Sequence, residues 1–487
     1  MTLLILALGC GGDPPSKPPP TTTAPAPVPT TTTPPRPAAP ARILGPQELS
    51  DATVRLRGDA TTRCVGANIA GAGDTDGDGI DDLLIGARCD ALGGSGSGRA
   101  WLVPGGLDPG EHALLDVASG SLSGTEPQQA VGWFLDGAGD LDGDGLHDIV
   151  VGAPSSVSEL SGFVGVIYGP LTDDRPLDQA DAVLLGPSGG GAGRVVGDLD
   201  LTGDNNADLV ISDAQYFLPP ADPVSSTVWI IGDAPVGDVD LDTSAVARVI
   251  DQGTAYLGSR LAGGGDLDGD GVDDLILSSW QNLAYTLSGP LSGDLSLDDA
   301  TSSLVVPDLG DVQPSFTGAV LSVGGGGDGD GDGKDDMLVA QAYISYVRDG
   351  RAWIVRDPQG TGLDIEVYAI ASLIGETESW AGDSLAWLGD LDGDGFDDLA
   401  VGAPRHTHNG LDAGAVHLLY GPLQGQIALA DSDAVFFGEG TSDMAGAVAN
   451  VGDLDGDTWP DLAVGALSWG QGDDHPGAVY VVLPSAL

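Results

Sequence analysis

The sequence is poor in basic residues and in long apolar segments. Of its 487 residues, 17 are lysine or arginine and 73 are aspartate or glutamate, so the formal net charge is −56. Nucleic acids and anionic membrane surfaces would be repelled by this charge, and we do not expect them as partners. After Cys10 no apolar run approaches the about 20 residues that a membrane-spanning helix needs. Hydrophobic residues still make up 41% of the chain, which is enough for a packed core.

Cysteine is also scarce, and the three cysteines fall into two groups. Cys10 ends a short apolar start and resembles the acylated cysteine of a bacterial lipoprotein signal, although the segment lacks a basic beginning. A truncated signal is the alternative. Cys64 and Cys89 flank the first acidic motif almost symmetrically. An antiparallel hairpin would bring them opposite each other, and we expect a disulfide in an exported protein, with two buried thiols as the alternative.

Glycine and aspartate are abundant, and they recur together in a motif that is repeated seven times at intervals of 60 to 66 residues. Each copy is a nine-residue aspartate ladder followed at once by a short apolar strand, as in the ladder that begins at Asp140 and precedes residues 149–154. A long fixed period indicates one supersecondary unit that is copied and stacked. The ladders begin at Asp74, Asp140, Asp200, Asp266, Asp328, Asp390 and Asp453.

Each repeat is predicted to contain four short strands. One strand runs into the ladder, as at 65–69, and the second leaves it as a nearly continuous apolar run, as at 82–87. A third follows at 98–103, and a weaker fourth ends in glycine, as at 434–438. The chain stops after the third strand of the last repeat, whereas residues 52–58 resemble a fourth strand without a preceding blade. We therefore predict an all-β fold: a seven-bladed β-propeller of four-stranded antiparallel blades, closed by an N-terminal strand that joins the last blade.

The ladder has the spacing of a site for a hard cation. Carboxylates at positions 1, 3, 5 and 9, with glycines at 4 and 6, let the loop curl around an ion, and the carbonyl of position 7 adds a ligand. Calcium is favoured over magnesium because so many protein oxygens replace water, and we expect up to seven ions. The predicted ligands are Asp74, Asp76, Asp78, Ile80 and Asp82; Asp140, Asp142, Asp144, Leu146 and Asp148; Asp200, Thr202, Asp204, Asn206 and Asp208; Asp266, Asp268, Asp270, Val272 and Asp274; Asp328, Asp330, Asp332, Lys334 and Asp336; Asp390, Asp392, Asp394, Phe396 and Asp398; Asp453, Asp455, Asp457, Trp459 and Asp461.

Two ladders depart from the pattern. The third has Thr202 at position 3 and Asn205 at position 6, and the seventh has Thr458 at position 6, where a positive φ is costly for a branched residue. An EF-hand begins with a similar ladder, but it needs a glutamate at position 12, where the first repeat has Ile85 inside a strand. Turns that bind no metal would explain a single copy better than seven.

Taken together, a strand, Asp-x-Asp-Gly-Asp-Gly-x-x-Asp and then Asp-Leu-x-Val-Gly-Ala-Pro resemble the FG-GAP repeat of integrin alpha subunits and their bacterial relatives. The resemblance implies a seven-bladed propeller with calcium in hairpin loops on one face and partner binding on the other. No segment of the length of an integrin inserted domain lies between the repeats, and the long stalk and membrane helix are missing. The resemblance therefore implies the fold, and it does not imply the ligands of integrins.

We expect three regions along the chain. Residues 1–10 form a lipoprotein-type signal that ends at Cys10, residues 11–44 a disordered Pro/Thr-rich linker, and residues 45–487 the propeller. The expected location is outside the cytoplasm, at the outer membrane or cell surface through the lipid anchor. Apart from that anchor we expect no membrane contact, and we expect a monomer.

No catalytic constellation is recognisable, and we predict a protein without enzymatic activity. The first hypothesis is an adhesion or interaction module for an extracellular protein or matrix ligand; the second is a lectin that binds glycans, and a polysaccharide-active enzyme ranks third. Trp133, Trp280, Trp380, Trp387 and Trp469 would form a sugar-binding rim or, more commonly, fill gaps between blades. An Arg-Gly-Asp tripeptide at 57–59 and two histidines, at 406 and 408, are better explained as a strand end and an exposed loop.

Overall fold

The computed structural model describes residues 38–487, except 60, 155–161, 188–190, 214–225, 233, 252–256, 280–281, 308–320, 343–348, 468–475 and 485–487. Cys10, the predicted signal and the predicted linker up to residue 37 lie outside the described residues. From Ala38 onward the chain forms one compact unit.

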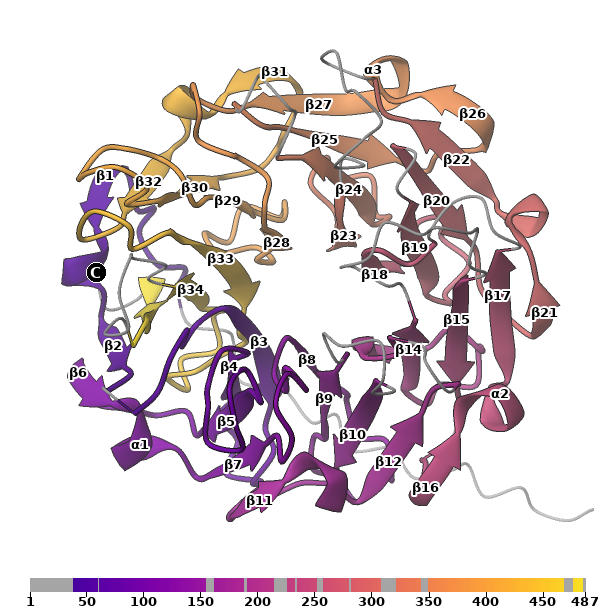
Figure 1. Ribbon diagram of the computed structural model, residues 1–487. Coiled ribbons are helices and arrows are strands. Elements are labelled where there is room, and N and C mark those ends of the chain that lie inside the picture. The colour runs from indigo at the N-terminus through magenta and orange to yellow at the C-terminus, as the bar shows by residue number, and fades with distance from the viewer. Residues whose placement is uncertain are drawn as a thin grey trace, which may run out of the picture. The chain divides into compact units, whose positions relative to one another are not determined.

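This unit is a ring of seven β-sheets around a central axis, so the predicted all-β, seven-bladed propeller is confirmed (Figure 1). Blades 1 to 4 are, from the axis outward, β3 (Asn68–Gly73), β4 (Asp82–Ala87), β5 (Arg99–Val103), β7 (Gly120–Ser123) and β11 (Asp174–Pro176); β8 (Phe134–Gly137), β9 (Ile149–Ala153), β10 (Phe163–Ile167), β12 (Ala182–Leu185) and β16 (Gly237–Asp240); β13 (Arg194–Leu199), β14 (Asp208–Ser212), β15 (Ser226–Ile231), β17 (Ala247–Asp251) and β21 (Gly293–Leu295); β18 (Leu261–Gly265), β19 (Asp274–Ser279), β20 (Leu283–Leu287), β22 (Ser302–Val305) and β26 (Gly360–Asp364).

Blades 5 to 7 repeat this arrangement: β23 (Ser322–Gly327), β24 (Asp336–Gln341), β25 (Arg351–Arg356), β27 (Ala369–Ile374) and β31 (Gly425–Ala428); β28 (Leu385–Trp387), β29 (Leu399–Ala403), β30 (Ala415–Leu419), β32 (Ala434–Phe437) and β1 (Gly45–Glu48); β33 (Ala445–Asn450), β34 (Leu462–Ala466), β35 (Ala478–Val482), β2 (Val54–Arg57) and β6 (Gly110–Ala113). The innermost strands begin up to three residues later than predicted, because the residues before them form turns.

The blades have five strands and not the predicted four. In each blade the fifth strand pairs in parallel with the fourth, as β11 does with β7, and it comes from the connection between the third and fourth strands of the next blade. The added strand covers an edge that would otherwise expose unpaired backbone groups. A one-turn helix follows each fifth strand: η1 (Leu49–Asp51), α1 (Leu114–Val117), η2 (Leu177–Gln179), α2 (Leu241–Ser244), η3 (Leu297–Asp299), α3 (Ile365–Tyr368) and η4 (Leu429–Asp431).

The N-terminal segment closes the ring at two places. As predicted, β2 is the fourth strand of the last blade, where it pairs with β35 in antiparallel fashion. In addition, β1 pairs with β32 as the fifth strand of blade 6. One segment near the start of the described chain therefore completes the two blades that lie at its end.

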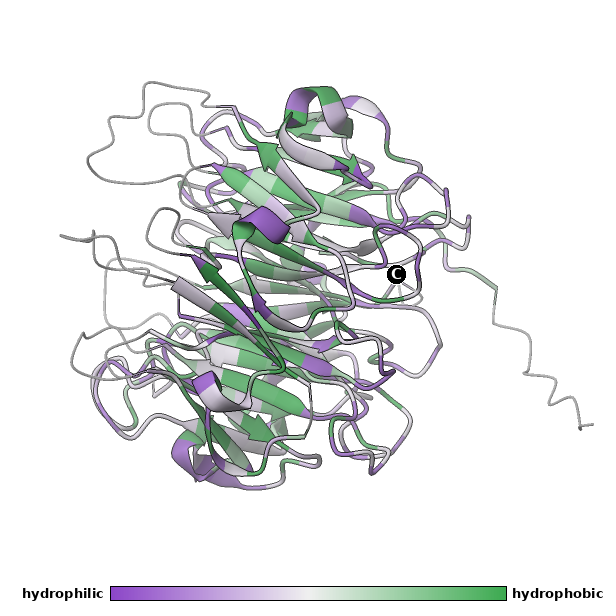
Figure 2. Cartoon of the chain, turned by 90° about the vertical axis from the view of Figure 1, so that its right-hand side faces the viewer, coloured by the Kyte–Doolittle hydropathy of each residue, from purple (hydrophilic) through white to green (hydrophobic). Residues whose placement is uncertain are grey.

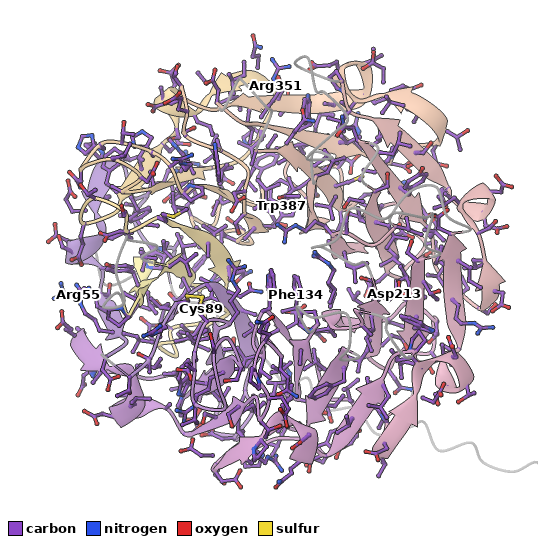
Figure 3. The ribbon with its side chains drawn as sticks, viewed as in Figure 1. Arg55, Cys89, Phe134, Asp213, Arg351 and Trp387 are labelled. Carbon is purple, nitrogen blue, oxygen red and sulfur yellow. A yellow bond between two sulfur atoms is a disulfide. The ribbon has the colours of Figure 1, made fainter. Side chains whose placement is uncertain are left out.

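The hydrophobic core lies between the blades. Seven clusters of buried side chains each join two neighbouring blades, and the last of them joins blade 7 to blade 1. The strands carry most of the hydrophobic residues, and the loops on either side of the ring are more hydrophilic (Figure 2). Phe134 and Trp387 lie next to the axis, whereas Arg55 lies at the rim (Figure 3). None of the helices in the described part of the chain has the length and apolar character needed to cross a membrane.

Candidate metal centres

The seven ladders occupy equivalent loops. Each ladder connects the innermost strand of a blade to the second strand, as the ladder from Asp74 to Asp82 connects β3 to β4. Because the innermost strands all run in the same direction along the axis, the ladders gather at one end of the ring.

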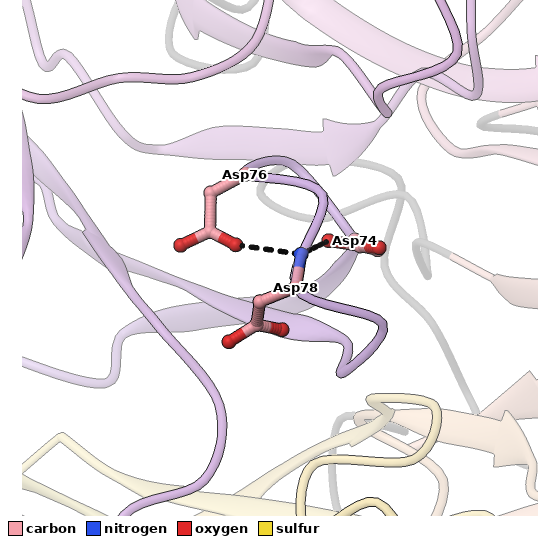
Figure 4. Close-up of side chains that lie close together, drawn as sticks. All are labelled: Asp74, Asp76 and Asp78. Atoms are coloured by element: carbon pink, nitrogen blue, oxygen red, sulfur yellow. Dashed lines mark hydrogen bonds between the residues drawn. The ribbon is translucent and has the colours of Figure 1, made fainter.

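Backbone N–H groups hold the first carboxylate of each loop. In the first loop Asp74 Oδ1 accepts from Gly77 N (2.7 Å) and Asp78 N (3.1 Å), and Asp74 Oδ2 accepts from Gly79 N (2.9 Å) (Figure 4). The N–H groups of positions 5 and 6 donate to position 1 in all seven loops. The loop therefore folds around its own first carboxylate.

The same curl brings further carboxylates together. Within each of five sets, oxygens of three aspartates lie within 4.8 Å of one another; the sets combine positions 1, 3 and 5 in three loops and positions 1, 3 and 9 in two loops: Asp74, Asp76 and Asp78; Asp266, Asp268 and Asp270; Asp328, Asp330 and Asp332; Asp140, Asp142 and Asp148; Asp390, Asp392 and Asp398. Position 7 lies beside them, because its N–H donates to the position 5 carboxylate in every loop; these donors are Ile80, Leu146, Asn206, Val272, Lys334, Phe396 and Trp459.

The ninth position carries a buried carboxylate in all seven loops, at most 1% exposed. In the sixth loop Asp398 Oδ2 accepts from Leu391 N (2.9 Å) and Oδ1 accepts from Gly421 N (2.9 Å), which ties the ladder to the end of the third strand. Burial, with a smaller contribution from nearby ladder carboxylates, raises the pKa of Asp398 to about 7 and that of Asp461 to about 8. These carboxylates are thus costly to ionise until a positive charge is near.

The composition of the loops suits a hard cation. Their converging groups are oxygens, and Asp336 Oδ1 is buried without a hydrogen-bond partner among the described residues. A buried acceptor of this kind is expected to have a ligand, and calcium takes six to eight oxygens from flexible loops of this type.

The two irregular ladders adopt the same loop. Asn205 has φ of +65° and Thr458 has φ of +75°, so both occupy the left-handed conformation that glycine has at position 6 elsewhere. In the third loop Thr202 replaces the carboxylate of position 3, and its N–H donates to Asp208 Oδ2 (2.8 Å). This loop therefore offers one carboxylate fewer than the others.

Arginine side chains reach two of the ladders. Arg356 Nη1 lies 2.8 Å from Asp330 Oδ2 and 3.2 Å from Asp332 Oδ2 in the fifth loop. Arg42 pairs with Asp392 and, at 2.7 Å, with Asp394 in the sixth loop. A guanidinium group thus supplies positive charge at these two carboxylate sets.

The eighth position has a role that the ladder pattern did not reveal. Asp273 Oδ2 accepts from Asp200 N (2.8 Å), and Asp273 N donates to the carbonyl of Asp200 (3.1 Å), which joins the loops of blades 4 and 3. The same exchange joins Asp81 to Asp453, Asp335 to Asp266 and Asp397 to Asp328. The recurring Asp-Asp dipeptides at 81–82, 273–274, 335–336 and 397–398 are the signal that could have identified these residues.

The remaining predicted residues have structural contacts. Cys64 and Cys89 form a disulfide across the β3–β4 hairpin. Arg57 pairs with Glu111 (3.1 Å) and Glu439 (2.7 Å), so the charge of its tripeptide is already neutralised. Trp387 fills a gap between blades, since an added Cβ on Gly329 would lie 2.4 Å from its ring.

The two loop histidines also have partners. His406 Nε2 lies 3.2 Å from Glu376, and His408 stacks on Phe437 with ring centroids 3.9 Å apart. Trp280 and Trp469 lie outside the described residues.

Comparison with known proteins identifies the repeat. The FG-GAP repeat family matches residues 131–168, 381–419 and 445–482, which lie in blades 2, 6 and 7. The chain is 30% identical over 228 residues to Integrin alpha pat-2 of Caenorhabditis briggsae, a match that covers 43% of the chain and 18% of that protein. It is 39% identical over 98 residues to Integrin alpha-7 of Homo sapiens, covering 20% of the chain and 8% of that protein.

A second kind of relative shares only part of this region. The Phosphatidylinositol-glycan-specific phospholipase D of Dictyostelium discoideum is 30% identical over 161 residues, which are 28% of the chain and 17% of that enzyme. The chain thus matches less than a fifth of the length of each of these curated relatives. By its repeats, its propeller fold and these similarities, the chain is an FG-GAP repeat protein related to the integrin alpha subunits.

Proposed function

We propose that the protein is a calcium-binding, surface-displayed propeller that acts as an adhesion or protein/matrix interaction module. The convergence of ladder carboxylates at one end of the ring carries this proposal. The calcium ligands would be the residues at positions 1, 3, 5, 7 and 9 of each ladder. Calcium would neutralise each set and hold the loop tips rigid, which leaves the opposite end of the ring for a partner.

Similarity to integrin alpha subunits supports an extracellular interaction role. Acylation of Cys10 and a Pro/Thr-rich spacer would place the propeller at the cell surface. We propose no catalytic activity, because the matched region covers a minor part of the phospholipases and the ladder accounts for the acidic residues that gather in the loops.

Removal of calcium tests the first half of this proposal. Saturation of a site at one hundred times its dissociation constant stabilises the folded state by about 2.7 kcal/mol. Chelation should therefore lower the melting temperature by roughly 10 °C or more, as measured by calorimetry, and calcium but not sodium should restore it. Elemental analysis should find several calcium ions per chain; an unchanged melting temperature together with no bound metal would contradict the proposal.

Partner capture tests the second half. The purified propeller, with and without calcium, should retain a protein or matrix component from the native cell surface, and the captured material is identified by mass spectrometry. Saturable binding to one class of sugar on a glycan array, without protein capture, would favour a lectin instead.

A further inference from the structure

A cavity of about 280 Å³ lies at the axis of the ring. Its described lining includes residues that precede or begin the innermost strands, such as Arg260 before β18 and Phe134 at the start of β8. Since these strands run from the cavity into the ladders, the cavity lies at the end of the ring opposite the ladders. We call Arg88, Arg194, Arg260, Trp133, Phe134 and Trp380 in this lining the channel-mouth cluster.

The cluster concentrates positive charge in an acidic protein. Three of its residues are arginines, although the whole chain has 17 basic and 73 acidic residues. Asp383 is the acidic residue among the described lining residues, and it lies in the electrostatic field of Arg260 and Arg88. The described lining thus carries two net positive charges where the protein as a whole is strongly negative.

Aromatic rings hold two of these guanidinium groups in place. Arg88 lies 4.6 Å from the ring centroid of Trp133, and Arg194 lies 4.4 Å from that of Phe134. The two rings are stacked, with centroids 5.9 Å apart and an angle of 8° between their planes. Cation–π contacts at these distances fix the direction of each guanidinium without consuming all of its N–H donors.

The third arginine and the burial of the second point to a ligand. Arg260 Nε is buried without a hydrogen-bond partner among the described residues, and Arg194 is only 4% exposed. Buried charged groups are stable when an opposite charge or hydrogen-bond acceptor meets them. A planar carboxylate matches the geometry of guanidinium groups better than other common anionic groups of proteins do.

We propose that the channel-mouth cluster binds a carboxylate group presented by a protein partner whose surrounding surface is basic. This inference rests on the proposed role as an interaction module and specifies the chemistry of its partner. A partner with a basic surface would be steered towards the acidic propeller, and its single carboxylate, from a side chain or a chain end, would enter the cavity. A polyanionic glycan would have the carboxylate but would be repelled by the surface around the cavity.

The test uses three labelled probes with the full calcium-loaded protein. They are a lysine-rich peptide with one central glutamate, the same peptide with glutamine, and an oligosaccharide of glucuronic acid. Fluorescence anisotropy should show that the glutamate peptide binds at least about tenfold more tightly than the glutamine peptide, and that the oligosaccharide binds weakly. Arg88→Gln and Arg260→Gln, two separately folded variants checked by circular dichroism, should each reduce the preference for glutamate to less than about threefold.

Arg248→Gln is the matched control, because Arg248 pairs with Asp294 at 2.7 Å on the outer strands of blade 3. This variant should keep the full preference for the glutamate peptide. Equal binding of both peptides, or an equal preference in all variants, would overturn the inference, and tighter binding of the oligosaccharide would overturn the choice of a protein partner. Because calcium content is measured on the same samples, failure of the metal sites is distinguished from failure of the channel-mouth cluster.

Discussion

At the scale of single residues, repetition allows each side chain to be compared with its equivalents. In the third strands, His417 pairs with Val401 just as Trp101 pairs with Ile85, Trp229 with Ile211, Trp353 with Val339 and Tyr480 with Val464. This slot between the blades therefore takes large aromatic rings, and blade 6 fills it with an imidazole that is 0% exposed.

His417 should make the stability of the protein depend on pH. Burial, assisted by the nearby His406, lowers the pKa of His417 from 6.5 to about 4. The folded state thus favours the neutral ring, and the contribution of His417 to stability is lost as the pH falls from about 6.5 towards 4. His417→Phe, which fits the slot used by the other rings, should remove on the order of 3 kcal/mol of this acid sensitivity.

Urea denaturation of both proteins between pH 7 and pH 4 measures this effect. Both are studied in EDTA, so that release of calcium by acid does not contribute. Parallel losses of stability in the parent and the variant would contradict the assignment.

The arginine at the fifth ladder should weaken calcium binding there. Arg356 is 2.8 Å from Asp330, and an exposed ion pair of this kind contributes about 1 kcal/mol at most. Because calcium must displace this guanidinium, Arg356→Gln should increase the calcium affinity of one site by roughly fivefold. Isothermal titration of the parent, this variant and the Arg248→Gln control measures it; an unchanged or lower affinity would show that Arg356 does not compete with the ion.

At the scale of elements, the ladder hairpin is stabilised from both of its ends. The ladder holds the tip of the β3–β4 hairpin, and the disulfide between Cys64 and Cys89 joins its base. Asp81, next to the end of the ladder, joins the same hairpin to Asp453 of blade 7. The hairpin of blade 1 is thus fixed at the point where the first and last blades meet.

Removal of the disulfide should loosen this hairpin. The two cysteines are 25 residues apart, and a cross-link over a loop of this length stabilises by about 3 kcal/mol in the chain-entropy treatment. The double variant Cys64→Ser/Cys89→Ser should melt a few degrees below the parent in calorimetry. A reducing agent should lower the melting temperature of the parent to that of the double variant, while Cys10→Ser should have no effect; equal melting of the double variant and the unreduced parent would be the contrary result.

At the scale of the whole molecule, ring closure depends on one segment. Residues 45–57 provide β1 to blade 6 and β2 to blade 7. Without β2, the strand β35 would lose its antiparallel neighbour, and the core cluster that includes Val54 and Leu56 would be opened to solvent.

A pair of truncations tests this closure. A chain that begins at Ala38 retains the complete compact unit and should melt like the full-length protein. A chain that begins at Asp59 lacks β1 and β2, and it should lose its cooperative transition and aggregate, as followed by calorimetry and size-exclusion chromatography. Cooperative melting of the shorter chain at the parent temperature would show that the two strands are dispensable.

The sequence by itself determined the repeat, the strand type and the chemistry of the loops. A ladder that recurs every 60 to 66 residues fixes the number of blades, and a strand of apolar residues such as 82–87 can only be buried on both faces. Residues 52–58 also identified the closing strand, because the repeat supplied a template for the missing element. These features are local or periodic, so they can be read along the chain.

The tertiary structure decided what depends on neighbours distant in sequence. The fifth strand of each blade comes from the next repeat, and its pairing surface exists only after the blades are side by side. Asp81 and Asp453 are 372 residues apart, and Arg42 reaches a ladder that begins 348 residues later. The channel-mouth cluster likewise draws its arginines from three repeats. Such contacts follow from the closure of the ring, because a side chain's partners across a blade interface are set by three-dimensional packing and not by position in the repeat.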